Sequence, residues 1–393
     1  MARAFDRKSA LAFIVAFGVV SLFADMAYEG MRGITGPYLG LLGASGTAVG
    51  VIAGTGELFG YLLRLGSGRL AQRTGALWLI AFAGYALQMA AVPAIALTGS
   101  WWGAAALIIL ERSGKALRNP AANTMKSRAG EKIGQGWAFG LHEALDQTGA
   151  LMGPLITALV LAHHGRYQTA FLWLGVPAAI TIVIVAGVWI RFPWAGEMAP
   201  RRSESSDASF PRAFWLYAAS AALMAFGFAD WPLIAFHFAK AGIVAQPTIP
   251  ILYAIAMAGS GAGALAMGKL FDRQGFIVLL PAMLVAAAVT PLAFLGSGWL
   301  AVLGAMLWGT VLGMENSVLT AGVAELVPEQ ARATAFGAFS ATFGIAWFLG
   351  SALLGVLYDV SFSLLAGVSI AAELAAIVPL LLVMREPRAR RPS

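Results

Sequence analysis

Long apolar stretches separated by short polar segments run along the whole of this 393-residue chain. Several of them, such as residues 78–98, 171–190, 276–294 and 364–384, reach the ~20 residues that a helix needs to cross a bilayer. They are almost continuously apolar, whereas the strands of a membrane β-barrel alternate apolar and polar residues. The pattern therefore predicts an all-α membrane protein.

About twelve membrane-spanning helices are predicted. Their ranges are residues 10–39, 47–71, 76–98, 101–123, 136–162, 168–191, 213–241, 249–271, 276–296, 299–325, 332–357 and 361–384. The longest polar segment, 192–212, contains Pro, Ser, Glu and Arg and shows no helical periodicity. We therefore expect an N-terminal six-helix bundle at 1–191, a cytoplasmic linker at 192–212, and a C-terminal six-helix bundle with a short basic tail at 213–393.

Short internal repeats relate the two halves. Residues 68–75 (GRLAQRTG) recur as 268–275 (GKLFDRQG), residues 23–25 (FAD) as 228–230, and residues 138–140 (AFG) as 335–337. The copies occur in matching order and on corresponding predicted helices. Parallel repeats of this kind are typical of transporters made of two pseudo-symmetric bundles, with the substrate site between the bundles near the middle of the membrane.

Composition supports this interpretation. Hydrophobic residues make up 59% of the chain and charged residues 11%, against about 25% charged in soluble domains. There are no cysteines, which excludes disulfides and thiolate metal sites. The first apolar stretch is longer than the core of a signal peptide and contains charges, so it is predicted to be a membrane helix rather than a cleaved leader.

The distribution of basic residues predicts the orientation. With the N-terminus inside, Arg166 and Lys240 fall on the outer side, and Arg32, Arg64 and Arg112 fall within spans; every other Lys and Arg falls on the cytoplasmic side. This is the positive-inside pattern. It predicts both termini in the cytoplasm, and it explains the net charge of +7 without a nucleic-acid partner.

Residues 68–75 and 268–275 resemble the G-x-L-x-D-R-x-G loop motif of the major facilitator superfamily. Gln72 stands where the family has Asp, whereas Asp272 is kept. In the family this carboxylate helps to hold the outward-open state. The resemblance therefore implies a gating or coupling role for Asp272 and for the basic residues of both copies, Arg69, Arg73 and Arg273.

Further motifs resemble a prokaryotic efflux branch of that superfamily. Residues 149–154 (GALMGP) are similar to an antiporter motif, G-x-x-x-G-P, and residues 111–115, 117–120 and 138–142 with Asp146 are similar to runs of the branch. Ala122, Asn123 and Glu143 depart from the branch pattern, so the resemblance implies no role for the charges that other members carry there. It covers the whole chain and implies a multi-pass protein of the inner membrane of a prokaryote, but it does not indicate the substrate.

Four polar residues of the first predicted helix share one face. Asp25, Tyr28, Glu29 and Arg32 are spaced i, i+3, i+4 and i+7, and ionisable residues inside a membrane face the bundle interior or a cavity. They either line a substrate and proton cavity or include a static ion pair between Glu29 and Arg32.

The second half offers corresponding candidates for the cavity. Asp230 occupies the place on the seventh helix that Asp25 has on the first. It is followed by Trp231 and by Pro232, which is expected to kink the seventh helix. Glu315 and Asn316 lie in the middle of the tenth helix, where the carboxyl is either a cavity acid or a partner for a base across the bundle. Glu373 is interpreted as peripheral or as part of an oligomer contact.

Other intramembrane charges suit gating or coupling. Glu57 and Arg64 share a face of the second helix and are expected to form an ion pair near the cytoplasmic end, and Arg112 belongs to the branch motif. His142 and Asp146 are one turn apart, as a titratable pair or as an inter-helix hydrogen bond. Gly149 and Gly153, before Pro154, are predicted to provide a close-packing surface.

The sequence contains no nucleotide-binding loop, dinucleotide fingerprint or zinc-protease motif, which argues against an enzyme or a primary pump. The leading hypothesis is a proton-coupled efflux transporter for a small organic molecule, working by alternating access, as a monomer and without a cofactor or resident metal. Transport of a metal ion or its chelate, and a sensor that binds a ligand without moving it, are the alternatives.

Overall fold

The structure, a computed structural model, describes residues 5–197, 210–328 and 331–386, and within those ranges it contains helices and no β-strand. The helices are α1 (Arg7–Leu41), α2 (Gly46–Thr74), α3 (Leu77–Ala94), α4 (Trp101–Ile133), α5 (Gln135–His164), α6 (Tyr167–Arg191), α7 (Arg212–Gly227), α8 (Trp231–Lys240), α9 (Thr248–Gln274), α10 (Leu279–Leu295), α11 (Trp299–Leu326), α12 (Arg332–Val360) and α13 (Phe362–Arg385). Three short 3-10 helices, η1 (Ile95–Leu97), η2 (Pro193–Gly196) and η3 (Gly275–Val278), connect some of them.

The prediction of about twelve spans is confirmed. Ten stretches of the described chain are long and apolar enough to cross a membrane. One of them, Thr248–Leu295, contains both α9 and α10, and another, Arg212–Lys240, contains α7 and α8. The remaining crossing is α4, whose many charged residues lower its hydropathy. Counted in this way, the helices correspond one to one with the predicted ranges.

The seventh span is interrupted rather than kinked. It ends as α7 at Gly227 and starts again as α8 at Trp231. Pro232 lies in the first turn of α8, where its missing N–H costs nothing and its fixed φ suits a helix start. Asp230 has an extended backbone at this junction. The break therefore brings Asp230 and Trp231 into the middle of the molecule at the beginning of a new helix.

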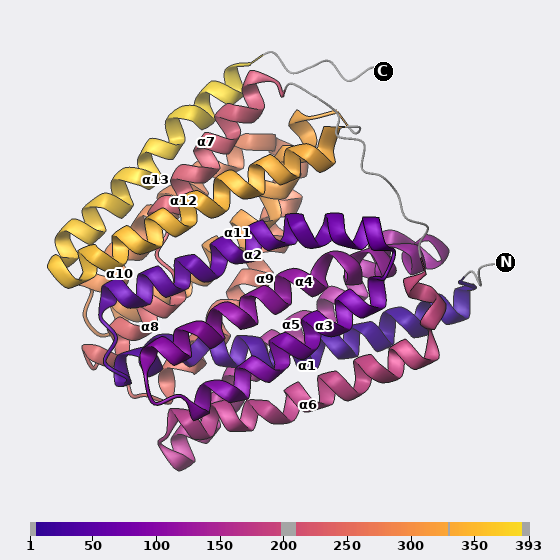
Figure 1. The fold of residues 1–393 in the computed structure, drawn as a ribbon. Helices are drawn as coiled ribbons and strands as arrows, with labels where there is room; N and C mark the ends of the chain where they lie inside the picture. Colours follow the sequence, from indigo (N-terminus) through magenta and orange to yellow (C-terminus); the bar gives the residue numbers. More distant parts are fainter. Residues whose placement is uncertain (1–4, 198–209, 329–330, 387–393) are drawn as a thin grey trace.

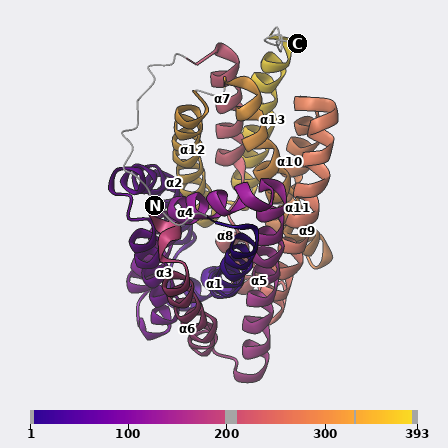
Figure 2. The ribbon, with the colours of Figure 1, turned by 90° about the vertical axis from the view of Figure 1, so that its right-hand side faces the viewer.

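The helices lie in two groups, α1–α6 and α7–α13, called the first and second groups below (Figures 1 and 2). Across the boundary α2 packs along α12, α5 along α9, and α1 against α8. The internal repeats equate the second span with the eighth (α9) and the fifth with the eleventh (α12). The pair α2/α12 is therefore the counterpart of the pair α9/α5, as a pseudo-twofold arrangement requires.

Small residues allow the helices to meet closely across this boundary. A Cβ on Gly50 of α2 would collide with the backbone of Ser351 on α12, and one on Gly36 of α1 would collide with the carbonyl of Pro232. Inside a membrane, where apolar surfaces gain little from leaving lipid, such close contacts supply much of the attraction between helices.

The two groups lie together at one end of the molecule and diverge towards the other (Figure 1). At the closed end, where α1 ends and α2 begins, Asp359 of α12 accepts hydrogen bonds from the backbone N–H groups of Gly46 (3.0 Å) and Thr47 (2.8 Å) and from the Thr47 hydroxyl (2.8 Å). The chain enters α1 and leaves α13 at the opposite end, called the open end below.

Candidate functional site

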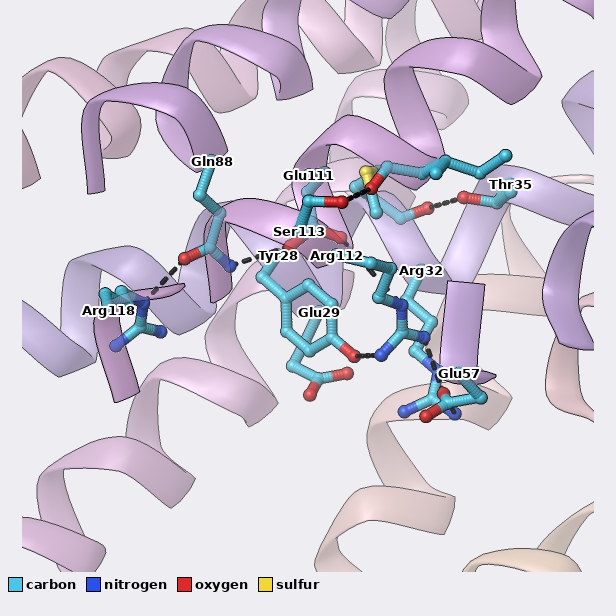
Figure 3. A network of polar contacts seen from close by, with 12 residues as sticks. Tyr28, Glu29, Arg32, Thr35, Glu57, Gln88, Glu111, Arg112, Ser113 and Arg118 are labelled. Carbon is cyan, nitrogen blue, oxygen red and sulfur yellow. Dashed lines mark hydrogen bonds and ion pairs between the residues drawn. The ribbon is translucent and has the colours of Figure 1, made fainter. Parts of the chain in front are cut away.

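The polar face of α1 meets charged side chains of α2 and α4 in the middle of the first group (Figure 3). Oε1 of Glu57 on α2 lies 2.9 Å from Nη2 of Arg112 on α4 and 3.5 Å from Nη2 of Arg32 on α1. All three side chains are largely shielded from solvent, so one carboxylate is shared between two guanidinium groups. Such a buried arrangement is stable only when each charge keeps its partners.

Tyr28 of α1 extends this arrangement. Arg112 donates a hydrogen bond to its hydroxyl, and the ammonium of Lys115 lies 3.6 Å from the ring centroid, where the aromatic face attracts a cation. Arg32, Glu57, Arg112, Tyr28 and Lys115 are called the central cluster below. Nε of Arg112 also lies 3.9 Å from Oε2 of Glu111, so three basic groups face two carboxylates. The remaining basic excess suits an anionic or strongly polar ligand better than a bare cation.

The central cluster reaches the boundary between the two groups of helices. A small cavity there is lined by Arg32, Gly56 and Arg112 of the first group and by Pro232 of the second. The break before α8 therefore forms part of the wall beside the cluster.

Glu29 connects the two groups directly. The hydroxyl of Tyr253 on α9 donates a 2.5 Å hydrogen bond to Oε2 of Glu29, and the indole N–H of Trp231 donates to the carbonyl of Gly33 at 3.3 Å. Within the described part of the chain no ion pair joins Glu29 to Arg32. The helical spacing correctly placed both on one face, but their side chains turn to different neighbours.

Asp25 lies at one end of a second series of polar side-chain contacts in the first group. Its Oδ1 is 3.8 Å from Nη2 of Arg118 on α4. Arg118 also donates to Oε1 of Gln88 at 2.7 Å and to the Tyr85 hydroxyl at 3.0 Å, and Gln88 donates to Glu111 at 2.7 Å. Figure 3 shows Gln88 between the basic and the acidic side chain. Arg118 is thus bound by residues of α1 and α3.

His142 and Asp146 of α5 turn to different partners. Nε2 of His142 is 2.6 Å from the ammonium of Lys126 and 3.3 Å from the hydroxyl of Ser21. Asp146 instead lies close enough to act on Asp25 electrostatically. No hydrogen bond or ion pair joins His142 to Asp146 among the described residues. Of the two predicted roles for His142, the structure therefore has the hydrogen bond between helices, with Lys126 as the partner, and not the pair with Asp146.

Asp230 is held inside the second group. The indole N–H of Trp347 donates to its Oδ1 at 2.8 Å, and the hydroxyl of Ser351 donates to its Oδ2 at 2.5 Å. Both partners belong to α12. Asp25 and Asp230, although related by the repeat, are thus each bound by helices of their own group. Trp231, the next residue, is the one that reaches across the boundary.

The charged residues near the open end lie apart from the central cluster. Arg64 is exposed and forms no ion pair with Glu57, which is occupied by Arg32 and Arg112. The expected Glu57–Arg64 pair is therefore not formed. The motif residues at the ends of α2 and α9 are also exposed and form no ion pair with any described residue; they are Arg69, Arg73, Asp272 and Arg273. The side chain of Gln72 lies outside the described residues.

Gly149 and Gly153 lie where α5 crosses α1. A Cβ on Gly149 would collide with the carbonyl oxygen of Leu22, and one on Gly153 with that of Met26. Pro154 also faces α1, near Gly33. These positions form the close-packing surface that the spacing of the glycines suggests.

Glu315 is placed differently from the expectation. It is buried within the second group, away from the central cluster, and it acts electrostatically on Glu373 of α13. Glu373 is fully buried as well, so its interpretation as a peripheral or oligomer-contact residue is wrong. The side chain of Asn316, the other candidate on α11, lies outside the described residues.

Several residues of the site were not singled out from the sequence. Gln88 is the one amide in an otherwise apolar helix, which is a usable signal. Tyr253 and Ser351 carry no such signal, because tyrosine and serine occur throughout membrane helices. Their roles depend on which helix lies opposite, and that is a property of the packed bundle.

Comparison with known proteins identifies relatives of the whole chain. The sequence pattern of the Major Facilitator Superfamily matches residues 9–351 and 244–393. An uncharacterized protein of Mycobacterium tuberculosis is 39% identical over 394 residues, covering 97% of this chain and 94% of the relative. The same figures hold for an uncharacterized protein of Mycobacterium bovis.

Solved transporter structures share the fold. A crystal structure of the nucleoside transporter NupG matches with a TM-score of 0.78 at 13% identity and covers 93% of this chain and 99% of that chain. The peptide transporter POT in complex with sulfate matches at 0.77 and 15% identity, covering 97% and 98%. A bacterial homologue of the iron transporter ferroportin in its inward-facing state matches at 0.71 and 14% identity, covering 96% and 99%.

Proposed function

The chain belongs to the major facilitator superfamily, and we propose that it exports a small organic molecule from the cell in exchange for protons. Transport by this chain would follow alternating access, with the two groups of helices rocking about a site between them. The substrate would bind beside the central cluster, where basic groups of the first group face the wall formed by Pro232.

The observation that carries the coupling proposal is the hydrogen bond from Tyr253 to Glu29. Glu29 is a buried carboxyl on one group, and its donor is a neutral phenol on the other. When the closed end opens, the two groups separate and Glu29 loses this donor. A buried carboxylate without a partner is costly, whereas the protonated acid is not. Opening towards the outside therefore favours uptake of a proton, and closing favours its release.

The proposed direction of exchange depends on the predicted orientation. The positive-inside pattern assigns the chain termini, and with them the open end, to the cytoplasm. The described conformation is then inward-facing, with the outer side closed by Asp359 and by the contact of α1 with α8. A proton taken up outside moves inward along its gradient, while substrate bound from the cytoplasm moves outward.

The central cluster narrows the substrate class. Arg32, Arg112 and Lys115 outnumber the two carboxylates that pair with them, Glu57 and Glu111. A substrate carboxylate, phosphate or polarised carbonyl can share these donors, since guanidinium groups bind such groups in a bidentate manner. A bare metal cation would be repelled. We therefore favour an organic molecule with an anionic or strongly polar group over the metal-ion alternative.

The test is proton exchange in proteoliposomes loaded with candidate organic anions and neutral metabolites. Compounds that are substrates should acidify or alkalinise the lumen in step with their own movement. Glu29→Gln, which keeps the size of the side chain but cannot take up a proton, should bind the compound and lose this coupled proton movement. Glu131→Gln, at an exposed acid near the end of α4, is the matched control. Coupled movement that persists unchanged in Glu29→Gln would refute the assignment.

A further inference from the structure

The second group contains two carboxyl groups that the proposed exchange does not use. Glu315 of α11 is 1% exposed and Glu373 of α13 is 0% exposed. All four of their carboxyl oxygens lack a hydrogen-bond partner among the described residues. The two groups also lie close enough for Glu315 to act on Glu373 electrostatically.

No basic side chain among the described residues balances the negative charge that these two carboxyl groups would carry when ionised. α10 contains no charged residue, and the charged residues of the other surrounding helices lie exposed near helix ends; they are Arg212 on α7, Lys269, Asp272 and Arg273 on α9, Glu325 on α11, Arg332 and Asp359 on α12, and Arg385 on α13. Asp230, beyond the end of α7, is occupied by Trp347 and Ser351. The nearby hydroxyl groups are occupied too, because Ser369 contacts Thr290 at 2.7 Å and donates to Gly227 at 2.6 Å.

The C-terminal end of α7 gives a second reason why Glu315 and Glu373 are not both ionised. A Cβ on Gly227, the last residue of α7, would lie 3.3 Å from Cγ of Glu373. The C-terminal end of a helix carries a partial negative charge, so it repels a carboxylate and favours a bound cation or a proton. Interrupted membrane helices use these ends to bind Na⁺ or H⁺.

We infer that Glu315 and Glu373 form a proton-binding site inside the second group, separate from the contact between the two groups. In the conformation described, protons neutralise the pair and allow it to remain buried. Loss of a proton would place negative charge against the end of α7, at the break that carries Asp230 and Trp231 to the boundary. A change in the charge of this site would therefore act on the break between α7 and α8, which lies beside the cavity at the central cluster.

The proton-binding site does not depend on the substrate or on the direction of transport. It can therefore be tested on purified protein without substrate. Infrared spectra of the purified protein in detergent, recorded in H₂O and D₂O at neutral pH, should contain a protonated carboxyl band that shifts on deuteration. Glu315→Gln and Glu373→Gln should each remove part of this band. Glu143→Gln, at an exposed acid of α5, should leave it unchanged.

Thermal unfolding provides a second measurement that does not depend on assigning a band. The wild-type protein should lose stability as the pH rises, because deprotonation creates buried negative charge, and the double Gln variant should lose much less. A band that is unchanged in both single variants, or a pH dependence of unfolding that survives in the double variant, would overturn the inference. So would a band that appears only after Na⁺ is removed at constant pH, since the pair would then be a sodium site.

Discussion

Tyr253 and Glu29 belong to opposite groups of helices, yet the phenol of Tyr253 donates a 2.5 Å hydrogen bond to the Glu29 carboxyl. Neither residue is more than 8% exposed. One carboxyl group therefore belongs both to the polar face of α1 and to the contact that keeps the closed end together. Any change in the protonation of Glu29 must also change the strength of that contact, because a charged acceptor binds a phenol more strongly than a neutral one.

Tyr253→Phe should weaken the closed end. It removes the donor and leaves a buried acceptor unsatisfied, which costs about 1–3 kcal/mol, or roughly a 5- to 150-fold shift in a conformational equilibrium. The chain has no cysteines, so a single Val49→Cys substitution can report on opening, because Val49 is fully buried near the start of α2. Its labelling by a water-soluble maleimide should become faster in Tyr253→Phe.

The matched control is Tyr217→Phe. Tyr217 is also a buried phenol, but it donates to the backbone of α11 inside the second group. Its loss should lower stability without accelerating labelling at position 49. Equal acceleration in both variants would mean that the effect is general loosening and not the loss of the contact between the groups.

Glu57→Gln should destabilise the first group. Arg32 and Arg112 would lose the carboxylate that they share, and breaking a buried ion pair on one side costs about 3–5 kcal/mol; the partial exposure of these side chains puts the expectation at the lower end. The measurement is thermal unfolding in detergent. Arg64→Gln on the same helix removes an exposed charge that has no ion pair, and it should leave the unfolding temperature nearly unchanged. A larger effect at Arg64 would contradict the placement of Glu57.

The helices, and a disturbance of the seventh span near Pro232, could be predicted from the sequence because their causes are local. That the span divides into two helices instead of bending could not be predicted. Hydrophobicity along about 20 residues decides whether a helix crosses a membrane, and Pro232 acts on its own turn. The repeat that relates Asp25 to Asp230 could also be found by inspection. The partners of the charged residues could not, because each is chosen from several neighbouring helices.

Arg32, His142 and Glu373 illustrate this limit. The spacing suggested that Arg32 pairs with Glu29 and His142 with Asp146, since residues three or four apart are neighbours on a helix. In the folded bundle Arg32 turns to α2 and His142 to α4 and α1. Glu373 lies in a helix that is apolar on all sides, so its sequence gave no indication of which face is buried.

Asp359→Ala should also shift the molecule away from the closed conformation. Its carboxylate accepts three hydrogen bonds from the start of α2, and two of them involve backbone N–H groups that no substitution on α2 can remove. The same labelling of Val49→Cys should detect a rise of a few-fold, smaller than for Tyr253→Phe because this contact is exposed to solvent. Thr47→Val should give part of the effect, and it should add little to Asp359→Ala, since both remove the same hydroxyl contact. Fully additive effects would show that the two residues act independently.

Gly153→Leu should prevent α5 from packing against α1. The site leaves no room for a Cβ beside the carbonyl oxygen of Met26, and forcing a side chain into a packed interface costs typically 1–3 kcal/mol, with larger values where backbone must move. Gly140→Leu is the control, because Gly140 lies on the same helix and a Cβ there would have no described atom within 4 Å apart from its chain neighbours and the adjacent helix backbone. The yield of monodisperse protein and its unfolding temperature should fall for Gly153→Leu and remain close to wild type for Gly140→Leu.

Gly153→Ala is less disruptive and should retain folded protein. Because Glu29 and Tyr28 lie on the part of α1 that α5 supports, this variant should impair coupled proton movement. Normal coupling in that variant would show that the position of α1 tolerates the displacement, and that the close crossing serves stability alone.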